Sequence, residues 1–274
     1  GWLGGISYIR NLLVAICSNH PRQIEPVLFV SPELNFRSLV GFPSIEIIRT
    51  WLVASRHPAR LASGVFYNVM KRDLTLELLL KKHQVEVLSH SSFTGVSSQV
   101  ASIGWIPDFQ HVRMPQYFSE NLRQKRNIEF QRLIDGCHRI VLSSHDAQRD
   151  FETFAPGAAN KSRVLQFVSC LDSRSSVLPR AQLYDRFNID RPYFHLPNQF
   201  WTHKNHAVVI DALSVLRSRG VNVLVIATGK TFDYRNPSHF QSLIAKAKHL
   251  DVDENFRVVG EVSLDELQSL MLNA

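Results

Sequence analysis

Lys204 lies where a predicted strand ends and a predicted helix begins, in the stretch NQFWTHKNH (residues 198–206). The amide groups at the start of a helix carry partial positive charge, and a lysine adds a full charge to them. This combination suits a phosphate group. Taken alone, the stretch is also compatible with a solvated lysine on an exposed turn, so both interpretations are open at this point.

Three other predicted loops carry residues of the same kind, namely Gly4-Gly5, Pro107 to His111 and Gly229-Lys230. Glycine lets the backbone approach a ligand closely. In open α/β sheets, ligands bind outside the carboxyl ends of the strands. We therefore expect these loops and residues 198–205 to converge on one cleft.

Several familiar catalytic signatures are missing from the sequence, namely GxGxxG after a strand, GxxxxGK[ST], GxSxG, HExxH and CxxC. The three cysteines, Cys17, Cys137 and Cys170, have no metal-type spacing and are too few for a disulfide framework. Neither a dinucleotide enzyme, a P-loop ATPase, a serine hydrolase nor a zinc site is supported. We expect no metal and no cofactor.

Short apolar runs rich in β-branched residues alternate with amphipathic stretches along the whole chain, which predicts βαβ units and parallel sheets covered on both faces. The fold class is therefore α/β. The predicted strands are Pro26 to Val30, Ser44 to Ile48, Val85 to Leu88, Ser102 to Ile106, Arg139 to Ser143, Arg163 to Val168, Tyr193 to Pro197, Val221 to Thr228 and Phe256 to Val259.

The segment from Asn205 to Arg219 is typical of a crossover helix. Val209, Leu213 and Leu216 fall on one face, and we expect this face to lie in the core. Asn205 is suited to cap the start of the helix, and Gly220 to end it.

Between Ser169 and Asp190 the alternating pattern gives way to a polar stretch, so we place a domain boundary there. The predicted domains are residues 1–178 and residues 190–274. The second is short and stops within a helix at Asn273-Ala274. The first begins with the loop Gly4-Gly5, which feeds a helix from Ser7 to Ser18 with its strand missing. We therefore expect a chain truncated at both ends.

Hydrophobic residues make up 45% and charged residues 20% of the chain, as in soluble globular proteins. No apolar run is long enough to cross a bilayer and no signal peptide is evident, so we expect a cytoplasmic protein. The net charge is +7. Its excess lies in residues 1–180, with 21 Lys and Arg against 14 Asp and Glu, and residues 181–274 carry 10 of each. This bias is compatible with a nucleic acid, an anionic membrane or a phosphorylated substrate as partner, and also with no partner at all.

The order of several motifs resembles glycosyltransferase family 4, the retaining enzymes of GT-B fold, over nearly the whole chain. Its C-terminal domain is matched by LPNQFWTHKNH, VNVLVIATGK and FRVVGEVSLDELQSLMLNA. Its N-terminal domain is matched by GWLGGISYIRNLL, GWIPDFQHVRMPQYFS and RIVLSSHDAQRDF. The resemblance implies two Rossmann-like domains with parallel sheets facing across a cleft, the second domain incomplete.

The resemblance also implies which residues bind a nucleotide-sugar donor. Lys204 would neutralise the diphosphate as it leaves, without a metal. Gln199 stands where the family usually has arginine, and it supplies hydrogen bonds but no charge. The remaining donor-site residues by position are Asn198, Gly229 and Lys230 near the donor, and Glu261, Val262 and Ser263 near the base.

On the acceptor side, the resemblance implies that His111 is a catalytic residue of the cleft, close to the transferred sugar. Asp108 belongs to the same motif, although a carboxylate just after a strand is often a turn former. Ser144 is either a nucleotide contact or a helix cap. Gly4 and Gly5 would let the backbone approach the ligand.

The function implied is a retaining hexosyltransferase that moves a sugar from a GDP- or UDP-sugar to a glycan or polyprenyl-linked acceptor. A basic acceptor domain also suits peripheral contact with an anionic membrane at its inner face. The alternative is a non-catalytic GT-B-fold binding module or inactive fragment, motivated by Gln199 and by a family glutamate pair that would lie beyond Ala274. A nucleic-acid partner rests on charge alone, and we expect none.

Overall fold

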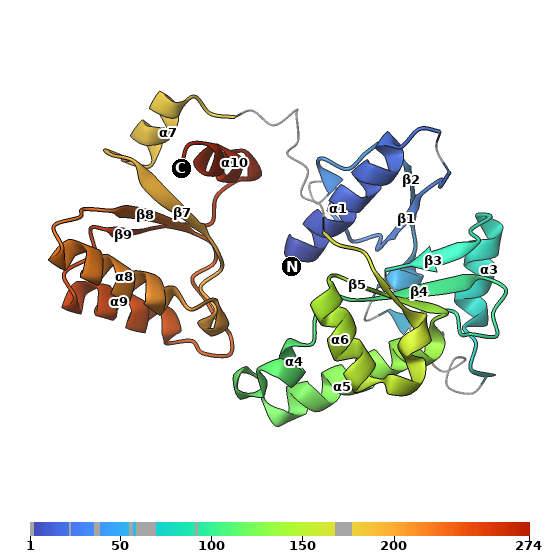
Figure 1. The fold of residues 1–274 in the computed structure, drawn as a ribbon. Helices are drawn as coiled ribbons and strands as arrows, with labels where there is room; N and C mark the ends of the chain where they lie inside the picture. Colours follow the sequence, from blue (N-terminus) through green and yellow to red (C-terminus); the bar gives the residue numbers. More distant parts are fainter. Residues whose placement is uncertain are drawn as a thin grey trace. The chain divides into compact units, whose positions relative to one another are not determined.

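The structure is a computed structural model that describes residues 3–21, 23–35, 39–54, 57–58, 70–90, 93–167 and 177–274. The chain divides into two compact units, Gly1–Cys170 and Leu171–Ala274. Each unit has its own parallel β-structure and its own core, so each is described by itself (Figure 1). Among the described residues, none of the helices has the length and apolar character that a membrane span requires.

Unit 1 contains two parallel sheets. The smaller pairs β1 (Val27–Val30) with β2 (Glu46–Arg49). The larger has the strand order β3-β4-β5-β6, formed by Val87–Ser89, Ala101–Ile106, Arg139–Leu142 and Ser162–Val164.

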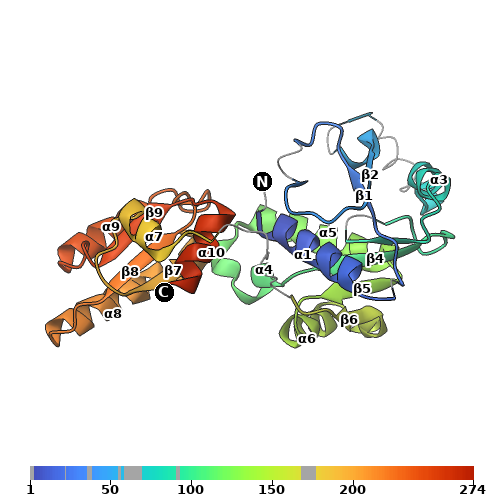
Figure 2. The ribbon, with the colours of Figure 1, turned by 90° about the horizontal axis from the view of Figure 1, so that it is seen from above.

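Helices cover both faces of the larger sheet. Figures 1 and 2 show α1 on one side and α5 and α6 on the other. The second face forms the main core of the unit, where Ile106 and Ile140 of the sheet pack with Phe130 of α5 and Phe151 of α6. The helices that the structure describes in unit 1 are α1 (Leu3–Ser18), α3 (Leu74–Lys82), α4 (Gln110–Arg113), α5 (Glu120–Gly136) and α6 (His145–Phe154), with 3-10 turns at Trp51–Val53, Pro115–Tyr117 and Pro156–Lys161.

The prediction of a loop at Gly4-Gly5 is wrong, because α1 begins at Leu3 and contains both glycines. Gly5 is buried and Gly4 is exposed. A glycine inside a helix costs only about 0.5–1 kcal/mol relative to alanine, so a pair of glycines does not prevent helix formation. Neither residue forms the strand-to-helix loop expected of a ligand site.

Unit 2 is a three-stranded parallel sheet of order β7-β8-β9, formed by Tyr193–Pro197, Leu224–Thr228 and Phe256–Gly260. Every residue of the central strand β8 is buried, as expected of a parallel strand covered on both faces. The helices are α7 (Arg180–Arg186), α8 (His206–Ser218), α9 (His239–His249) and α10 (Leu264–Leu272).

The two faces of the unit 2 sheet have separate cores. α8 and α9 pack on one face, with Ile210 and Leu243 against Val225. α7 and α10 pack on the other, with Leu183 and Leu270 against the sheet (Figure 1). The polar stretch after Ser169 therefore includes a helix, α7, whose Leu183 is fully buried in this unit.

All nine predicted strands occur in the structure, most with ends within two residues of their predicted limits. The α/β fold with parallel sheets is thus confirmed. In helix α8, Leu213 is buried and Val209 packs against the core as predicted, and His206 and Ile210 are buried as well. Asn205 precedes this helix with φ of 52° and makes no side-chain capping bond, so the capping prediction is wrong.

Candidate functional site

Three loops meet at the carboxyl edge of the unit 2 sheet, because the strands that precede them are parallel neighbours. Residues 198–205 follow β7, residues 229–238 follow β8 and residues 261–263 follow β9. Backbone hydrogen bonds join them: the Phe200 amide donates to the Lys230 carbonyl at 2.9 Å, and the Gly229 amide donates to the Gly260 carbonyl at 2.8 Å. The structure thus brings together all the residues predicted to bind the donor.

Gly229 holds the first two loops in close contact. Its φ is +136°, a conformation that L side chains rarely adopt. A Cβ atom at this position would lie 2.5 Å from the carbonyl oxygen of Asn198 and 2.9 Å from the Cα of Gln199. Glycine is therefore required at position 229 so that the backbone after β8 can contact the backbone of Asn198 and Gln199 closely.

Lys204 ends the 3-10 turn Thr202–Lys204 and is exposed. No ion pair to its ammonium group occurs among the described residues. His206 follows the turn, and its buried ring stacks on Phe200 with centroids 4.3 Å apart. Burial lowers the pKa of His206, and this favours the neutral ring. Lys204 therefore lies at the start of α8, on a turn that packs against this buried stack.

Asp233 ties the loop after β8 to this turn. Its carboxylate is 1% exposed, and it accepts a hydrogen bond from the Thr202 amide at 3.1 Å and another from Arg235 Nε at 3.1 Å. Burial acts to raise the pKa of Asp233, but the hydrogen bonds from Thr202 and Arg235 outweigh it and hold the pKa below its usual value. Asp233 is therefore a charged anchor within the loop.

Arg235 is a cation of this site that the sequence reasoning missed. Its guanidinium lies over Trp201, 5.1 Å from the ring centre, and Nη2 donates to His203 Nδ1 at 3.2 Å. These contacts place it beside the turn that carries Lys204. The available signal was an acid and a base two residues apart, Asp233 and Arg235, in the loop after the predicted strand that ends at Thr228.

The loop after β9 contributes Glu261, Val262 and Ser263 to the carboxyl edge of the sheet. Glu261 is exposed and lies 3.7 Å from the Lys230 ammonium. Ser263 caps α10, because its hydroxyl accepts from the Glu266 amide while the Glu266 carboxylate accepts from the Ser263 amide. Val262 is half-buried. The Ser263 hydroxyl is thus already engaged in helix capping.

His111 of unit 1 is buried rather than open to solvent. It is 2% exposed, and its Nε2 lies 2.9 Å from the side-chain oxygen of Asn127. Phe130 packs edge-on against the ring, with centroids 5.1 Å apart. Burial and the nearby Arg126 lower the pKa of His111, so the ring is neutral at pH 7. The ring is therefore enclosed by side chains of unit 1.

Asp108 and Ser144 both have local structural partners. Asp108 Oδ1 accepts from the Gln110 amide at 3.1 Å and from Arg126 Nη2 at 3.3 Å, so it forms a turn and an ion pair. Ser144 caps α6, with its hydroxyl accepting from the Ala147 amide at 3.1 Å. Of the two roles considered for Ser144, the structure shows helix capping.

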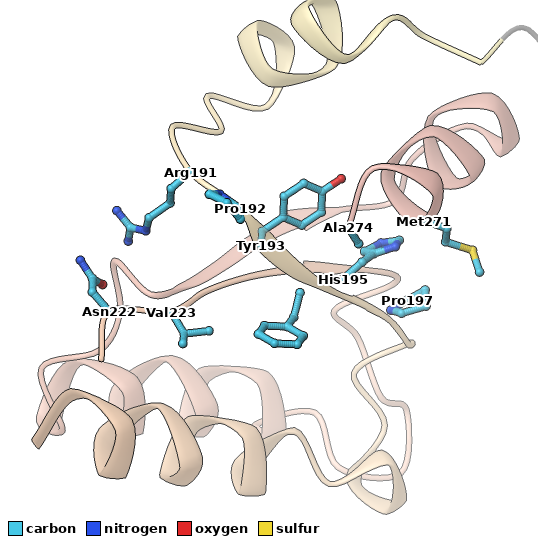
Figure 3. A pocket seen from close by; sticks show the side chains of 10 residues that line it. Arg191, Pro192, Tyr193, His195, Pro197, Asn222, Val223, Met271 and Ala274 are labelled. Carbon is cyan, nitrogen blue, oxygen red and sulfur yellow. The ribbon is translucent and has the colours of Figure 1, made fainter. Parts of the chain in front are cut away.

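A separate hollow of about 760 Å³ runs along the edge strand β7 (Figure 3). Its walls include Tyr193, His195 and Met271. The hollow extends from Asn222 and Val223, which precede β8, to Pro197, the last residue of β7. Within the described ranges, His, Cys, Asp and Glu form no group of three or more arranged to hold a metal ion.

Comparison with solved structures shows which proteins share this fold. A glycosyltransferase from Rickettsia africae ESF-5 matches with a TM-score of 0.61 and 14% identity, over 98% of this chain and 67% of that one. Anabaena Alr3699/HepE in complex with UDP-glucose matches with a TM-score of 0.61 and 11% identity, over 98% of this chain and 68% of that one. The same protein in complex with UDP and glucose gives a TM-score of 0.59 and 12% identity, over 98% and 69% of the two chains.

No protein-family model and no curated protein sequence matches the chain. The structural matches confirm the predicted fold class, since the chain has the GT-B-type α/β fold of glycosyltransferases.

Proposed function

We propose that the chain is a glycosyltransferase that takes a sugar from a nucleotide-sugar donor, a GDP- or UDP-sugar, and passes it to a glycan or lipid-linked acceptor with retention. One observation carries the proposal: Lys204 is exposed, has no ion-pair partner in the described part of the chain, and lies at the start of α8, where three loops of the unit 2 sheet meet. Fold alone does not fix function, but this fold is shared with a protein solved with UDP-glucose.

The donor diphosphate would bind at these loops. Lys204 and the first amides of α8 would neutralise the charge that develops as the nucleotide leaves, and no metal is required for this step. Asn198 and Gln199 would donate or accept hydrogen bonds on the same edge, while Gly229 allows close approach of the chain. Glu261, Val262 and Ser263 would lie near the base of the nucleotide.

His111 would act in this mechanism as a positioning residue. Its ring joins α4 to α5 through Asn127 and is packed against Phe130. It would therefore keep the segment after β4 in place, rather than bond to the transferred sugar. Asp108, paired with Arg126, supports the same segment.

The acceptor would bind unit 1, where the excess of positive charge lies. A polyprenyl diphosphate or an anionic membrane surface would be attracted by this charge. Equal sedimentation of the protein with anionic and with neutral liposomes would count against the membrane part of the proposal.

Calorimetric titration of UDP, GDP, UDP-glucose and GDP-mannose into the chain tests the donor site. Lys204→Ala should weaken binding of the preferred nucleotide by about 1.5–3 kcal/mol, which is roughly ten- to a hundredfold in Kd. Lys248→Ala is the matched control, because this lysine is exposed on α9 of the same unit. It should bind like the unchanged chain.

If the folded chain binds none of these nucleotides, the transferase proposal fails and a non-catalytic binding module takes its place. If both lysine variants weaken binding equally, the effect is one of general charge and the assignment of Lys204 fails.

A further inference from the structure

Three aromatic side chains from distant parts of unit 1 form a cluster near the carboxyl edge of its larger sheet. Tyr8 of α1 stacks on Trp105 of β4, with ring centroids 4.3 Å apart. Phe167, which follows β6, packs edge-on against Tyr8 at 4.9 Å. We call Tyr8, Trp105 and Phe167 the aromatic cluster. In Figure 1 the segment after β6 runs up to α1, in agreement with this contact.

A chain of polar groups borders the aromatic cluster. The Tyr8 hydroxyl lies 2.8 Å from Nε2 of His90, and the Ser89 hydroxyl lies 2.6 Å from Nδ1 of the same ring. Burial lowers the pKa of His90 to about 4, so the ring is neutral at pH 7 and carries one proton.

In either tautomer of His90, one hydroxyl hydrogen of Tyr8 or Ser89 has no acceptor among the residues that the structure describes and is available to a ligand. If Tyr8 donates to Nε2, then Nδ1 donates to Ser89 and the Ser89 hydrogen is free. If Ser89 donates to Nδ1, then Nε2 donates to Tyr8 and the Tyr8 hydrogen is free. The site therefore offers a donor beside the aromatic rings.

The aromatic cluster is not fully buried by the packing of α1 on the sheet. Phe167 is 55% exposed, and Leu165 on the same segment is also exposed. Both lie after β6, at the carboxyl edge where ligands bind in open α/β sheets. Tyr8 and Trp105 are half-buried, so part of each ring remains accessible to a ligand.

We propose that the aromatic cluster, with Ser89 and His90, binds one sugar ring of the acceptor glycan. A sugar presents C–H groups on its faces and hydroxyl groups around its rim, so a face can lie on Phe167 while rim hydroxyls bond to Ser89 and the His90 chain. This inference rests on the proposed glycosyltransferase function and specifies the acceptor as a carbohydrate at this position.

The polar border favours a sugar over an isoprenoid chain. A hydrocarbon covering Ser89, His90 and Tyr8 would leave their free hydroxyl hydrogen without a partner, and burying an unpaired polar group is unfavourable. A sugar supplies both the apolar face and the hydrogen-bonding partners that this surface requires.

Saturation-transfer difference NMR tests the site with methyl glycosides of glucose, galactose, mannose and N-acetylglucosamine. Irradiation of the aromatic protons should transfer magnetisation mainly to C–H groups on one face of the preferred sugar. Phe167→Ala and Phe167→Leu should each reduce the signal at least fivefold. Phe194→Ala is the matched control, since Phe194 is 68% exposed but belongs to unit 2, and it should leave the signal unchanged.

Two further measurements separate the outcomes. Each variant is titrated with UDP and GDP, and retained nucleotide binding shows that unit 2 is intact. Geranyl phosphate serves as the isoprenoid probe. The inference is overturned if no glycoside binds, if the Phe167 variants bind as the unchanged chain does, or if geranyl phosphate binds at Phe167 and the glycosides do not. If the chain without substitutions binds neither UDP nor GDP, the proposed function is overturned instead.

Discussion

The close approach of the chain at Gly229 to Asn198 predicts a large effect of Gly229→Ala. The backbone there has φ of +136°, and the new Cβ would lie 2.5 Å from the Asn198 carbonyl oxygen. A non-glycine residue held in such a region costs of the order of 1–3 kcal/mol. The steric overlap adds to this, because the Asn198 and Gln199 atoms involved are backbone and cannot rotate away.

Gly220 provides the control that isolates the steric part. It also has a positive φ, +76°, but a Cβ built there meets nothing within 4 Å. Gly220→Ala should therefore cost only the conformational strain, about 1–2 kcal/mol, reduced by the lower entropy of the unfolded chain. Both glycines lie in unit 2, so the same unfolding transition reports on both.

Urea denaturation followed by circular dichroism gives the free energy of unfolding for each variant. Gly229→Ala should lose about 2 kcal/mol or more beyond Gly220→Ala, from the strain and overlap described above. Nucleotide binding should also be lost in Gly229→Ala and retained in Gly220→Ala. Equal losses of stability in the two variants would refute the argument that contact with Asn198 requires glycine at position 229.

Two charged or titratable groups give further predictions. Asp233→Asn should lower the free energy of unfolding at pH 7 by about 2–4 kcal/mol, because it leaves the mostly buried Arg235 without its carboxylate partner. The pKa of Asp233 is lowered in the fold, so its contribution to the free energy of unfolding is present above about pH 4 and is lost as pH falls through the pKa of the folded state. Urea denaturation from pH 3 to 7 should therefore show a smaller loss of stability on acidification in Asp233→Asn than in the unchanged chain. The pKa of His90 is lowered to about 4, below its unfolded value of about 6.5, so its contribution to stability is present above pH 6.5 and lost as pH falls to 4. His90→Gln should flatten the stability profile over that interval, and a profile parallel to that of the unchanged chain would show that His90 is not held neutral by the fold.

Hydrophobic patterning was sufficient to predict the strands and their parallel arrangement. Runs such as VNVLVIAT have no polar face, and this is the property of a strand buried on both sides, as β8 is. Once the strands are parallel, their carboxyl ends lie on one edge. The meeting of Lys204, Gly229 and Glu261 therefore followed from the sequence, although they are far apart along the chain.

Burial and local conformation at single residues were harder to predict. Gly4-Gly5 carry the composition of a loop, but the apolar face of the following helix extends through them and they are helical. His111 lies in a motif that suggested an open site, and only the tertiary packing of Phe130 and Asn127 shows that it is enclosed. The aromatic cluster was not predicted either, because Tyr8, Trp105 and Phe167 meet only when α1 packs on the sheet.

The charges of the donor loops indicate which cation a diphosphate would use. Arg235 is held by the buried Asp233, so its charge is largely cancelled and its guanidinium is fixed in place. Lys230 lies 3.7 Å from Glu261, and such an exposed pair is worth little, so it can separate when an anion arrives. Lys204 alone has no competing carboxylate among the described residues of these loops. It also lies at the start of α8, where the amides add to its field. In the proposed donor site, where Gln199 supplies no charge, Arg235 would therefore add little, and the neutralisation of a leaving diphosphate would fall mainly to Lys204.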